Sequence, residues 1–420
     1  MSLNRVLPAL ACLTFACDPS GASGTGGVEL PEEFGPSGQS CGRGLAVTLS
    51  DYVSTNVALV DLSGRTASSS FISSSSSAPL LDAALGGDVV LPSTRAGSEL
   101  VLLDRSPASI LTFVDWQTAE VRGQLDVGQG FAANPQDYLE LDAHRALVSR
   151  NAKNPDPDAS ALERGDDLLL VDPSRLAIVG SIDLSAARSP GFLVRPSALL
   201  RVGSSVLLSV SGHDAGFEDA AEGSIVILDA KRLVVTSVVP LPDLRNCTGM
   251  ALSPSGDELA VSCTGYIDDQ TNERGPPDSG LVLLAVKEGT DGTLVLEENQ
   301  RLLASGLERG PFAFSVAYAS EDALLFGAFG AIEGEDAGRP DTVLWFDAKS
   351  GATTVVLESL KMAFTLGQIQ CVAACEICFV ADAGRNVVQA VGVADGKLGA
   401  VRDFSIDDGI GLGPRSLGLF

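Results

Sequence analysis

A repeated pattern of apolar residues constrains the fold of this 420-residue chain more than any other feature. Seven times, a short apolar run ends at an aspartate or at a residue in its place, and a second apolar run follows after a few turn-forming residues. The ends of successive runs lie 45 to 62 residues apart, close to the roughly 40 to 50 residues of a propeller repeat. The runs span residues 57–61, 111–115, 168–172, 225–229, 281–285, 343–347 and 387–392.

Each repeat predicts four antiparallel strands, and the pattern is clearest in one of them. Its expected strands are residues 249–253, 258–262, 280–285 and 293–298. Runs such as 168–171 do not alternate with polar residues, as expected for strands that neighbouring blades cover on both faces. No convincing amphipathic helix separates the strands, which argues against a parallel α/β sheet.

The two ends of the array predict how it closes. The first repeat starts at residues 44–50 and lacks an innermost strand, while residues 414–420 form a strand with no partner in their own repeat. If that tail completes the first blade, the ring closes and no free edge remains. The serine-rich stretch 68–77 falls where the outer strand of the first blade is expected. The sequence therefore predicts an all-β, seven-bladed β-propeller over residues 44–420, with four-stranded antiparallel blades.

Charge and composition limit the partners. A hydrophobic content of 45% is enough for a large core. The net charge of −26 argues against nucleic acid and against an anionic membrane surface, because both are bound through Lys and Arg. Cations, basic proteins and neutral ligands remain, and we expect a monomer.

The N-terminus predicts export. Arg5 precedes the apolar stretch 6–16, and Ala16 precedes Cys17. Residues 1–16 look like a lipoprotein signal peptide that leaves Cys17 acylated. Thr14 departs from that pattern, and an ordinary secretory peptide cut nearby is the alternative.

Residues 17–43 are rich in Gly, Ser and Pro, which predicts a flexible tether. No other run approaches the roughly 18 to 20 apolar residues of a membrane span, so we expect attachment to a membrane only through the lipid. The predicted location is the cell envelope, either periplasmic or membrane-anchored.

Six further cysteines predict three disulfides in an exported protein. The hairpin register pairs Cys247 with Cys263 and Cys371 with Cys378. The remaining two, Cys41 and Cys375, would join the first blade to the last.

A haem, zinc or redox role for residues 375–378 is disfavoured. Phe379 stands where c-type haem attachment needs His, the two histidines lie in distant repeats, and the motif falls in a strand turn rather than at a helix N-terminus.

Short motifs resemble a known repeat family. SPSGDELAVS at 253–262 and NVALVDLSG at 56–64 are similar to the elements of YVTN-type β-propeller repeats. GFAANPQDYLEL at 130–141 and the ending GLGPRSLGLF resemble uncharacterised bacterial propeller lipoproteins. The resemblance implies the fold and says little about activity. Ala285 and Gly392 replace the repeat aspartate.

Candidate binding residues lie on one predicted face. Four long acidic loops between second and third strands would give that face a negative field. They could hold Ca²⁺, which prefers six to eight oxygen ligands, or could simply be solvated. Their acidic residues include Asp156, Asp158, Asp166, Asp167, Asp214, Glu218, Asp219, Glu222, Asp268, Asp269, Glu273, Asp278, Glu333, Glu335, Asp336 and Asp341. Near strand entrances on the same face, the residues that could line a central channel are Asn134, Asp137, Asn151 and Asn246.

Catalytic motifs are scarce. The chain has two histidines, His144 and His213, and no HExxH, GxSxG, Walker or GxGxxG motif. Trp116 and Trp345 are the only tryptophans, which disfavours a pyrroloquinoline quinone site of the propeller type. We expect a binding or scaffold protein that acts through its acidic loop face on an envelope protein or a small-molecule ligand, with no cofactor other than a Ca²⁺ ion. The alternative is a calcium-dependent propeller hydrolase or lactonase, and catalysis stays open.

Overall fold

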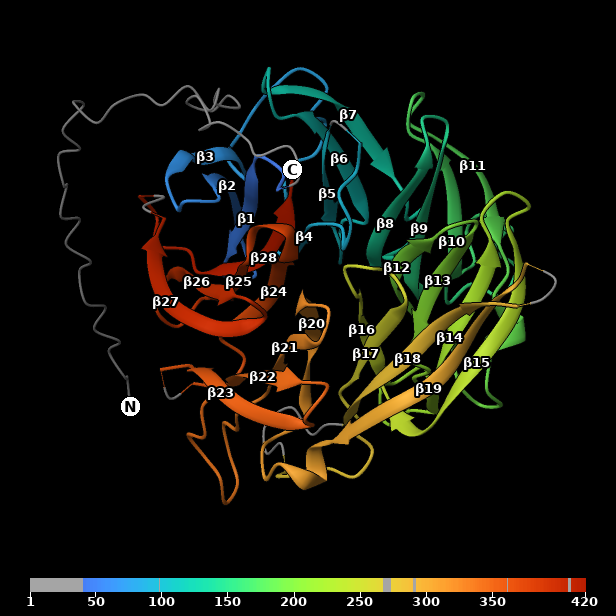
Figure 1. Ribbon diagram of the computed structural model, residues 1–420. Helices are drawn as coiled ribbons and strands as arrows, with labels where there is room; N and C mark the ends of the chain where they lie inside the picture. Colours follow the sequence, from blue (N-terminus) through green and yellow to red (C-terminus); the bar gives the residue numbers. More distant parts are fainter. Residues whose placement is uncertain (1–40, 98, 267–272, 290–291, 361, 407–408) are drawn as a thin grey trace, which may run out of the picture.

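Twenty-eight strands form a ring of seven four-stranded blades in the computed structural model (Figure 1). The structure describes residues 41–420 except 98, 267–272, 290–291, 361 and 407–408. The predicted signal peptide, Cys17 and most of the predicted tether therefore lie outside the described residues. Among the described residues no helix is long and apolar enough to cross a bilayer.

Each blade is an antiparallel sheet, and its first strand lies nearest the centre of the ring (Figure 1). Blade 1 contains β28 (Pro414–Leu419), β1 (Gly44–Ser50), β2 (Thr55–Asp61) and β3 (Thr66–Ser73). Blade 2 contains β4 (Val89–Val90), β5 (Leu100–Asp104), β6 (Ile110–Asp115) and β7 (Glu120–Asp126). Blade 3 contains β8 (Pro135–Asp142), β9 (Arg145–Lys153), β10 (Gly165–Asp172) and β11 (Ala177–Ile182). Blade 4 contains β12 (Pro196–Val202), β13 (Ser205–Val210), β14 (Glu222–Asp229) and β15 (Val234–Arg245).

The remaining three blades repeat the same order. Blade 5 contains β16 (Cys247–Leu252), β17 (Glu258–Cys263), β18 (Gly280–Glu288) and β19 (Leu294–Leu303). Blade 6 contains β20 (Phe312–Ser320), β21 (Ala323–Ala328), β22 (Thr342–Asp347) and β23 (Ala352–Glu358). Blade 7 contains β24 (Leu366–Val372), β25 (Ile377–Asp382), β26 (Val387–Ala394) and β27 (Lys397–Ser405). Three short 3₁₀ turns span Ser185–Ala187, Ala304–Gly306 and Ala373–Cys375.

The predicted fold is confirmed down to its closure. All seven apolar runs fall in the third strand of a blade, and residues 68–73 of the serine-rich stretch lie in the outer strand β3. The C-terminal strand β28 pairs with β1, with Leu417 opposite Val47. The core consists of seven apolar clusters, each shared by two neighbouring blades, as the uninterrupted apolar runs require.

The repeat aspartate has a local structural role at the end of the third strand. In Asp115 and Asp347, one carboxylate oxygen accepts backbone N–H groups two and three residues further on, which fixes the turn into the fourth strand. Asp61 and Asp229 make similar bonds, and these bonds lower the pKa of both carboxyls despite some burial. Where Ala285 replaces the aspartate, the third strand β18 continues to Glu288 and the fourth strand β19 begins only at Leu294.

The three disulfides join the predicted pairs. Cys247 bonds Cys263 across one hairpin, and Cys371 bonds Cys378 across another. The third bond joins Cys41 to Cys375, which are 334 residues apart in sequence. This bond ties the chain before blade 1 to blade 7, at the point where the ring closes.

Candidate functional site

The two ends of the ring differ because each blade is antiparallel. One end carries the loops between second and third strands together with the links from one blade to the next; we call it the loop face. The other end carries the remaining connections, most of them short turns, and we call it the turn face. The longest loops on the loop face, at residues 154–164, 211–221, 264–279 and 329–341, belong to blades 3 to 6.

Exposed apolar side chains gather on the loop face. Among the described residues, fifteen large apolar side chains are exposed, and five of these lie on outer strands. The other ten lie in loops or at a strand start of the loop face: Tyr52, Val53, Leu80, Phe217, Tyr266, Phe314, Ile332, Leu360, Met362 and Ile410. Single exposed apolar residues are common on protein surfaces, but here ten of the fifteen described ones lie on the same face.

Two of the predicted loop carboxylates are buried instead. Asp166 and Asp167 lie in β10, so the expectation that they belong to an exposed acidic loop is wrong. Asp167 forms two hydrogen bonds of 2.8 Å with the guanidinium of Arg150, whose side chain is fully buried. Asp166 accepts the backbone N–H groups of Val194 and Arg195 at 3.1 and 2.7 Å. Both carboxylates hold the scaffold together.

Asp341 is also buried, with 1% of its surface exposed. Its two oxygens accept the backbone N–H groups of Gly330, Phe364, Thr365 and Leu366 at 2.7 to 3.1 Å. The carboxylate thereby joins a blade 6 loop to the link that enters blade 7, so its acidic character serves the fold.

Other loop carboxylates are exposed or half-buried, and arginines offset part of their charge. Asp219 and Asp278 lie 2.8 and 3.8 Å from Arg245, and Asp336 pairs with Arg274. Asp278 also accepts the N–H of Tyr266. The exposed carboxylates of these loops include Asp156, Asp158, Glu218, Glu273, Glu333 and Glu335. Asp268 and Asp269 lie outside the described residues.

Of the four residues predicted at the channel, Asn134, Asp137 and Asn246 lie at strand entrances of the loop face, and Asn151 lies near the end of β9. Asn134 and Asn246 directly precede β8 and β16 with φ of 52° and 51°, a backbone conformation that Asn tolerates. Asn151 is buried, and its backbone and side-chain oxygens accept Nη1 of Arg195 at 3.2 and 3.4 Å. Asn134 accepts a hydrogen bond from Gln136. The side chains that line the cavity described below are others, and a ligand role for these four residues stays a prediction.

Asp137 is the fourth of these residues and is 2% exposed. One oxygen accepts the N–H groups of Ser93 and Tyr138, both at 2.9 Å, and the other accepts that of Leu199 at 2.7 Å. It therefore joins blades 2, 3 and 4. Burial raises the pKa of Asp137 to about 6, and the three donated hydrogen bonds oppose this rise.

The innermost strands surround a cavity of about 620 Å³ that opens on the loop face. Blades 6, 7 and 1 line one side of this opening with aromatic and cationic groups. The rings of Phe314 and Phe329 lie 5.3 Å apart, and those of Phe329 and Phe364 lie 4.8 Å apart. The guanidinium of Arg415 stands 4.8 Å from the centre of the Tyr52 ring.

The lining continues into blades 2 and 3. Nη2 of Arg105 contacts Asp88 at 2.5 Å, and Nη1 contacts Gln136 at 3.3 Å. Blades 4 and 5 contribute small residues such as Ala198 and Gly249 and larger apolar ones such as Leu200 and Met250. The arrangement combines a flat apolar wall, two guanidinium groups and free space, which is the make-up of a small-molecule pocket.

No sequence pattern points to this aromatic and cationic wall. Tyr52, Phe314 and Arg415 are far apart in the sequence and share no motif. The one feature of the sequence that could have indicated the wall is strand position, because Phe314 and Arg415 both lie at the start of an innermost strand.

The two histidines lie on opposite faces. His144 is exposed in a turn of the turn face and contacts the hydroxyl of Ser174. His213 lies in a loop-face loop, where burial lowers the pKa of its imidazole. Among the described residues, no three His, Cys, Asp or Glu side chains gather as a candidate metal site.

The fold is shared with solved propellers of low sequence identity. The β-propeller domain of Cps50 (Swd1) from Myceliophteria thermophila is similar with a TM-score of 0.55 at 14% identity, over 87% of this chain and 100% of that one. A putative 6-phosphogluconolactonase from Bacteroides fragilis has a TM-score of 0.53 at 11% identity, over 91% and 99%. KlAtg21, in complex with the coiled coil of AgAtg16, has a TM-score of 0.51 at 13% identity, over 87% and 100%.

These likenesses show the fold alone, because identities this low do not transfer an activity. No protein-family model and no curated protein matches the chain.

Proposed function

We propose that this seven-bladed β-propeller is an exported, lipid-anchored protein that binds a partner protein through its loop face. The observation that carries the proposal is the distribution of exposed apolar side chains. Ten of the fifteen described ones lie on the loop face, and the other five are spread over outer strands. Binding residues concentrate on loops that a rigid scaffold holds in place.

The charge of the loop face suggests a basic partner. The exposed carboxylates Glu218 and Glu335 lie in the same loops as the exposed apolar residues Phe217 and Ile332. Apolar anchors surrounded by charged groups are typical of protein interfaces. The net charge of −26 would speed the encounter with a positively charged surface. The similar propeller KlAtg21 binds a coiled coil, so the fold is compatible with this role.

The membrane part of the proposal rests on the sequence of the N-terminus. Residues 1–16 resemble a signal peptide, and Cys17 would carry the lipid. We expect mass spectrometry of the mature protein to find an acylated Cys17, and Cys17→Ser to release a soluble form. An unmodified N-terminus at another position would contradict this anchor.

The binding part is tested with the full chain in its native envelope, by crosslinking and recovery of bound proteins. The test variant is Ile332→Ser with Met362→Ser, two loop-face side chains that are 55% and 59% exposed. The matched control is Val179→Ser with Val234→Ser, two outer-strand side chains that are 49% and 45% exposed. None of the four side chains belongs to the buried core.

We expect the wild type and the outer-strand variant to recover the same protein, and the loop-face variant to lose most of it. If both variants recover it equally, the loop face is not the binding surface. A calcium-dependent turnover of ester or lactone substrates by the purified chain would instead favour the hydrolase alternative.

A further inference from the structure

The cavity at the centre of the loop face contains a positive charge that no described carboxylate offsets. Its charged lining residues are Asp88, Arg105 and Arg415. Asp88 pairs with Arg105. Arg415 makes one described hydrogen bond, from Nη1 to the carbonyl oxygen of Phe364 at 2.9 Å, and the structure describes no ion pair for it. The lining therefore has a net charge of about +1, in a chain whose net charge is −26.

The guanidinium group of Arg415 also has unused hydrogen-bonding capacity. Among the described residues, Nη1 of Arg415 makes one hydrogen bond and its Nη2 makes none. A charge-assisted hydrogen bond to an anion would use this free capacity. The exposed carboxylates of the surrounding loops would repel an ion of high negative charge. These two conditions together favour an anion with a single charge.

The walls next to Arg415 are apolar and flat. Phe314 is 50% exposed at the opening and packs against Phe329, which is 6% exposed. Tyr52 is 62% exposed and lies against Arg415. Such rings provide a surface on which a planar apolar group can stack.

The channel itself provides the space for a ligand, while the wall beside Phe314 is close-packed. A Cβ on Gly249 of blade 5 would lie 2.2 Å from the carbonyl oxygen of Phe314. Blades 5 and 6 therefore approach closely through their backbones. The cavity volume of about 620 Å³ lies within the range of roughly 300 to 1,000 Å³ that small-molecule sites occupy.

We propose that the loop-face end of the central channel binds a small anion with one negative charge and a flat apolar body. Arg415 would hold the carboxylate or sulfonate group, with Arg105 as a second donor, and Phe314 and Tyr52 would contact the body. Tyr52 and Phe314 also belong to the exposed apolar side chains of the loop face, but Ile332 and Met362, which the protein-binding test replaces, do not line the cavity. The two proposals can therefore fail separately.

Two fluorescent probes with the same aromatic body test the site on the purified protein. 8-Anilinonaphthalene-1-sulfonate carries one negative charge, and N-phenyl-1-naphthylamine is its neutral counterpart. We expect the anionic probe to bind one site per chain and more tightly than the neutral probe. Arg415→Gln should weaken the anionic probe about tenfold or more, because it removes a charge-assisted contact, and should change the neutral probe less than about twofold.

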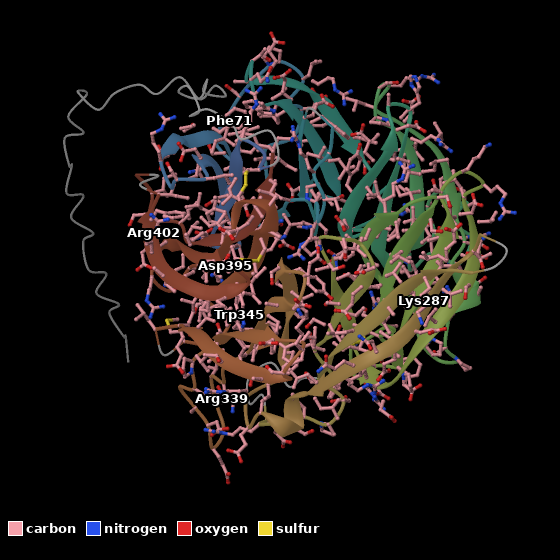
Figure 2. All side chains as sticks on the ribbon, in the orientation of Figure 1. Phe71, Lys287, Arg339, Trp345, Asp395 and Arg402 are labelled. Atoms are coloured by element: carbon pink, nitrogen blue, oxygen red, sulfur yellow. A yellow bond between two sulfur atoms is a disulfide. The ribbon has the colours of Figure 1, made fainter. Side chains whose placement is uncertain are left out.

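Matched controls separate the site from other apolar or cationic surface. Arg402→Gln removes an exposed arginine of the outer strand β27 (Figure 2) and should leave both probes unchanged. Phe314→Ala should weaken both probes. Phe217→Ala should weaken the binding of neither probe. Phe217 is a matched control because it is 52% exposed and its ring centre lies 3.9 Å from the guanidinium carbon of Arg195.

Arg415→Lys keeps the charge and should keep part of the preference for the anionic probe. If Arg415→Gln does not fold, Arg415→Lys still tests whether this side chain contacts the anionic group of the probe. The proposal is overturned if the wild type binds no more tightly to the anionic probe, if Arg415→Gln and Arg402→Gln behave alike, or if Phe217→Ala has the same effect as Phe314→Ala.

Discussion

Single buried carboxylates hold neighbouring blades together by accepting backbone N–H groups. Asp137 accepts three such groups and Asp341 accepts four. Each bond satisfies a donor that would otherwise be buried without a partner at a blade link. Several acidic residues that the sequence suggests are solvated on the surface are therefore buried and stabilise the fold.

The raised pKa of Asp137 leads to a pH-dependent prediction. Its folded-state pKa of about 6 lies above the ordinary value of 3.8, so the carboxyl destabilises the folded protein increasingly as the pH rises from about 4 to 6. Asp137→Asn should destabilise the protein through its lost hydrogen bonds, and the gap to wild type should shrink by roughly 2 kcal/mol between pH 4 and pH 7.

Urea unfolding of both proteins across this pH range measures the gap directly. The other carboxylates affect both proteins alike, so their contributions cancel in the difference. A gap that grows with pH would show that the three N–H donors outweigh burial and hold the pKa of Asp137 below 3.8.

Among the strands, the second strand of most blades carries a polar residue at the same position. Its fifth residue is Thr48, Asp104, Ser149, Ser209 or Ser262 in five of the seven blades, and all five are 0% to 2% exposed. The hydroxyls of Ser149 and Ser209 each accept an N–H from the first strand of their own blade and donate to a carbonyl of the next blade. These contacts fix the position of one blade against another.

Blades 6 and 7 have Gly327 and Ala381 at this position. There, side chains of the innermost strands make the link instead: Ser315 accepts the N–H of Ile369, and Gln368 accepts that of Leu417. The contact between blades is thus kept while the residue that makes it changes.

Removing one of these hydroxyls should lower stability measurably. Ser209→Ala leaves the N–H of Ala198 and the carbonyl of Thr248 buried without this partner, at a cost of about 1 to 3 kcal/mol. Ser205→Ala, at the half-buried start of the same strand, is the control and should change stability by less than about 0.5 kcal/mol. Equal effects of the two changes in urea unfolding would contradict the linking role.

In the whole molecule, a strand pairing and a disulfide close the ring at the same place. The strand β28 completes blade 1 from the C-terminal end of the chain, and the Cys41–Cys375 disulfide joins the chain before blade 1 to blade 7. One core cluster continues across this junction, where Leu45 and Leu417 of blade 1 pack with Phe379 of blade 7. The junction is therefore packed like the other blade interfaces.

The closing disulfide should stabilise the protein more than a hairpin disulfide does. Cys41–Cys375 spans 334 residues and Cys371–Cys378 spans 7, and a cross-link over a longer loop removes more entropy from the unfolded chain. Replacing both cysteines of the closing bond by Ala should cost roughly 3 kcal/mol more than the same replacement in the hairpin, as judged by urea unfolding. If both double replacements lower the free energy of unfolding equally, the closing disulfide does not stabilise the protein through loop entropy.

The sequence determined the architecture because the fold is built from a repeated local unit. Strand periodicity, turn residues and the repeat aspartate act within a few residues of one another, so seven copies of the pattern predicted seven blades. The unpaired tail at 414–420 predicted the closure, and hairpin register predicted the Cys247–Cys263 and Cys371–Cys378 bonds.

The tertiary structure alone decided which side chains meet. Asp166 and Asp167 look like members of an acidic loop, but the strand register buries them in β10. Tyr52, Phe314 and Arg415 gather at one opening only because the ring brings blades 1 and 6 around a common channel. Local pattern cannot encode such contacts, because they depend on how complete blades pack together, and that packing placed the candidate site.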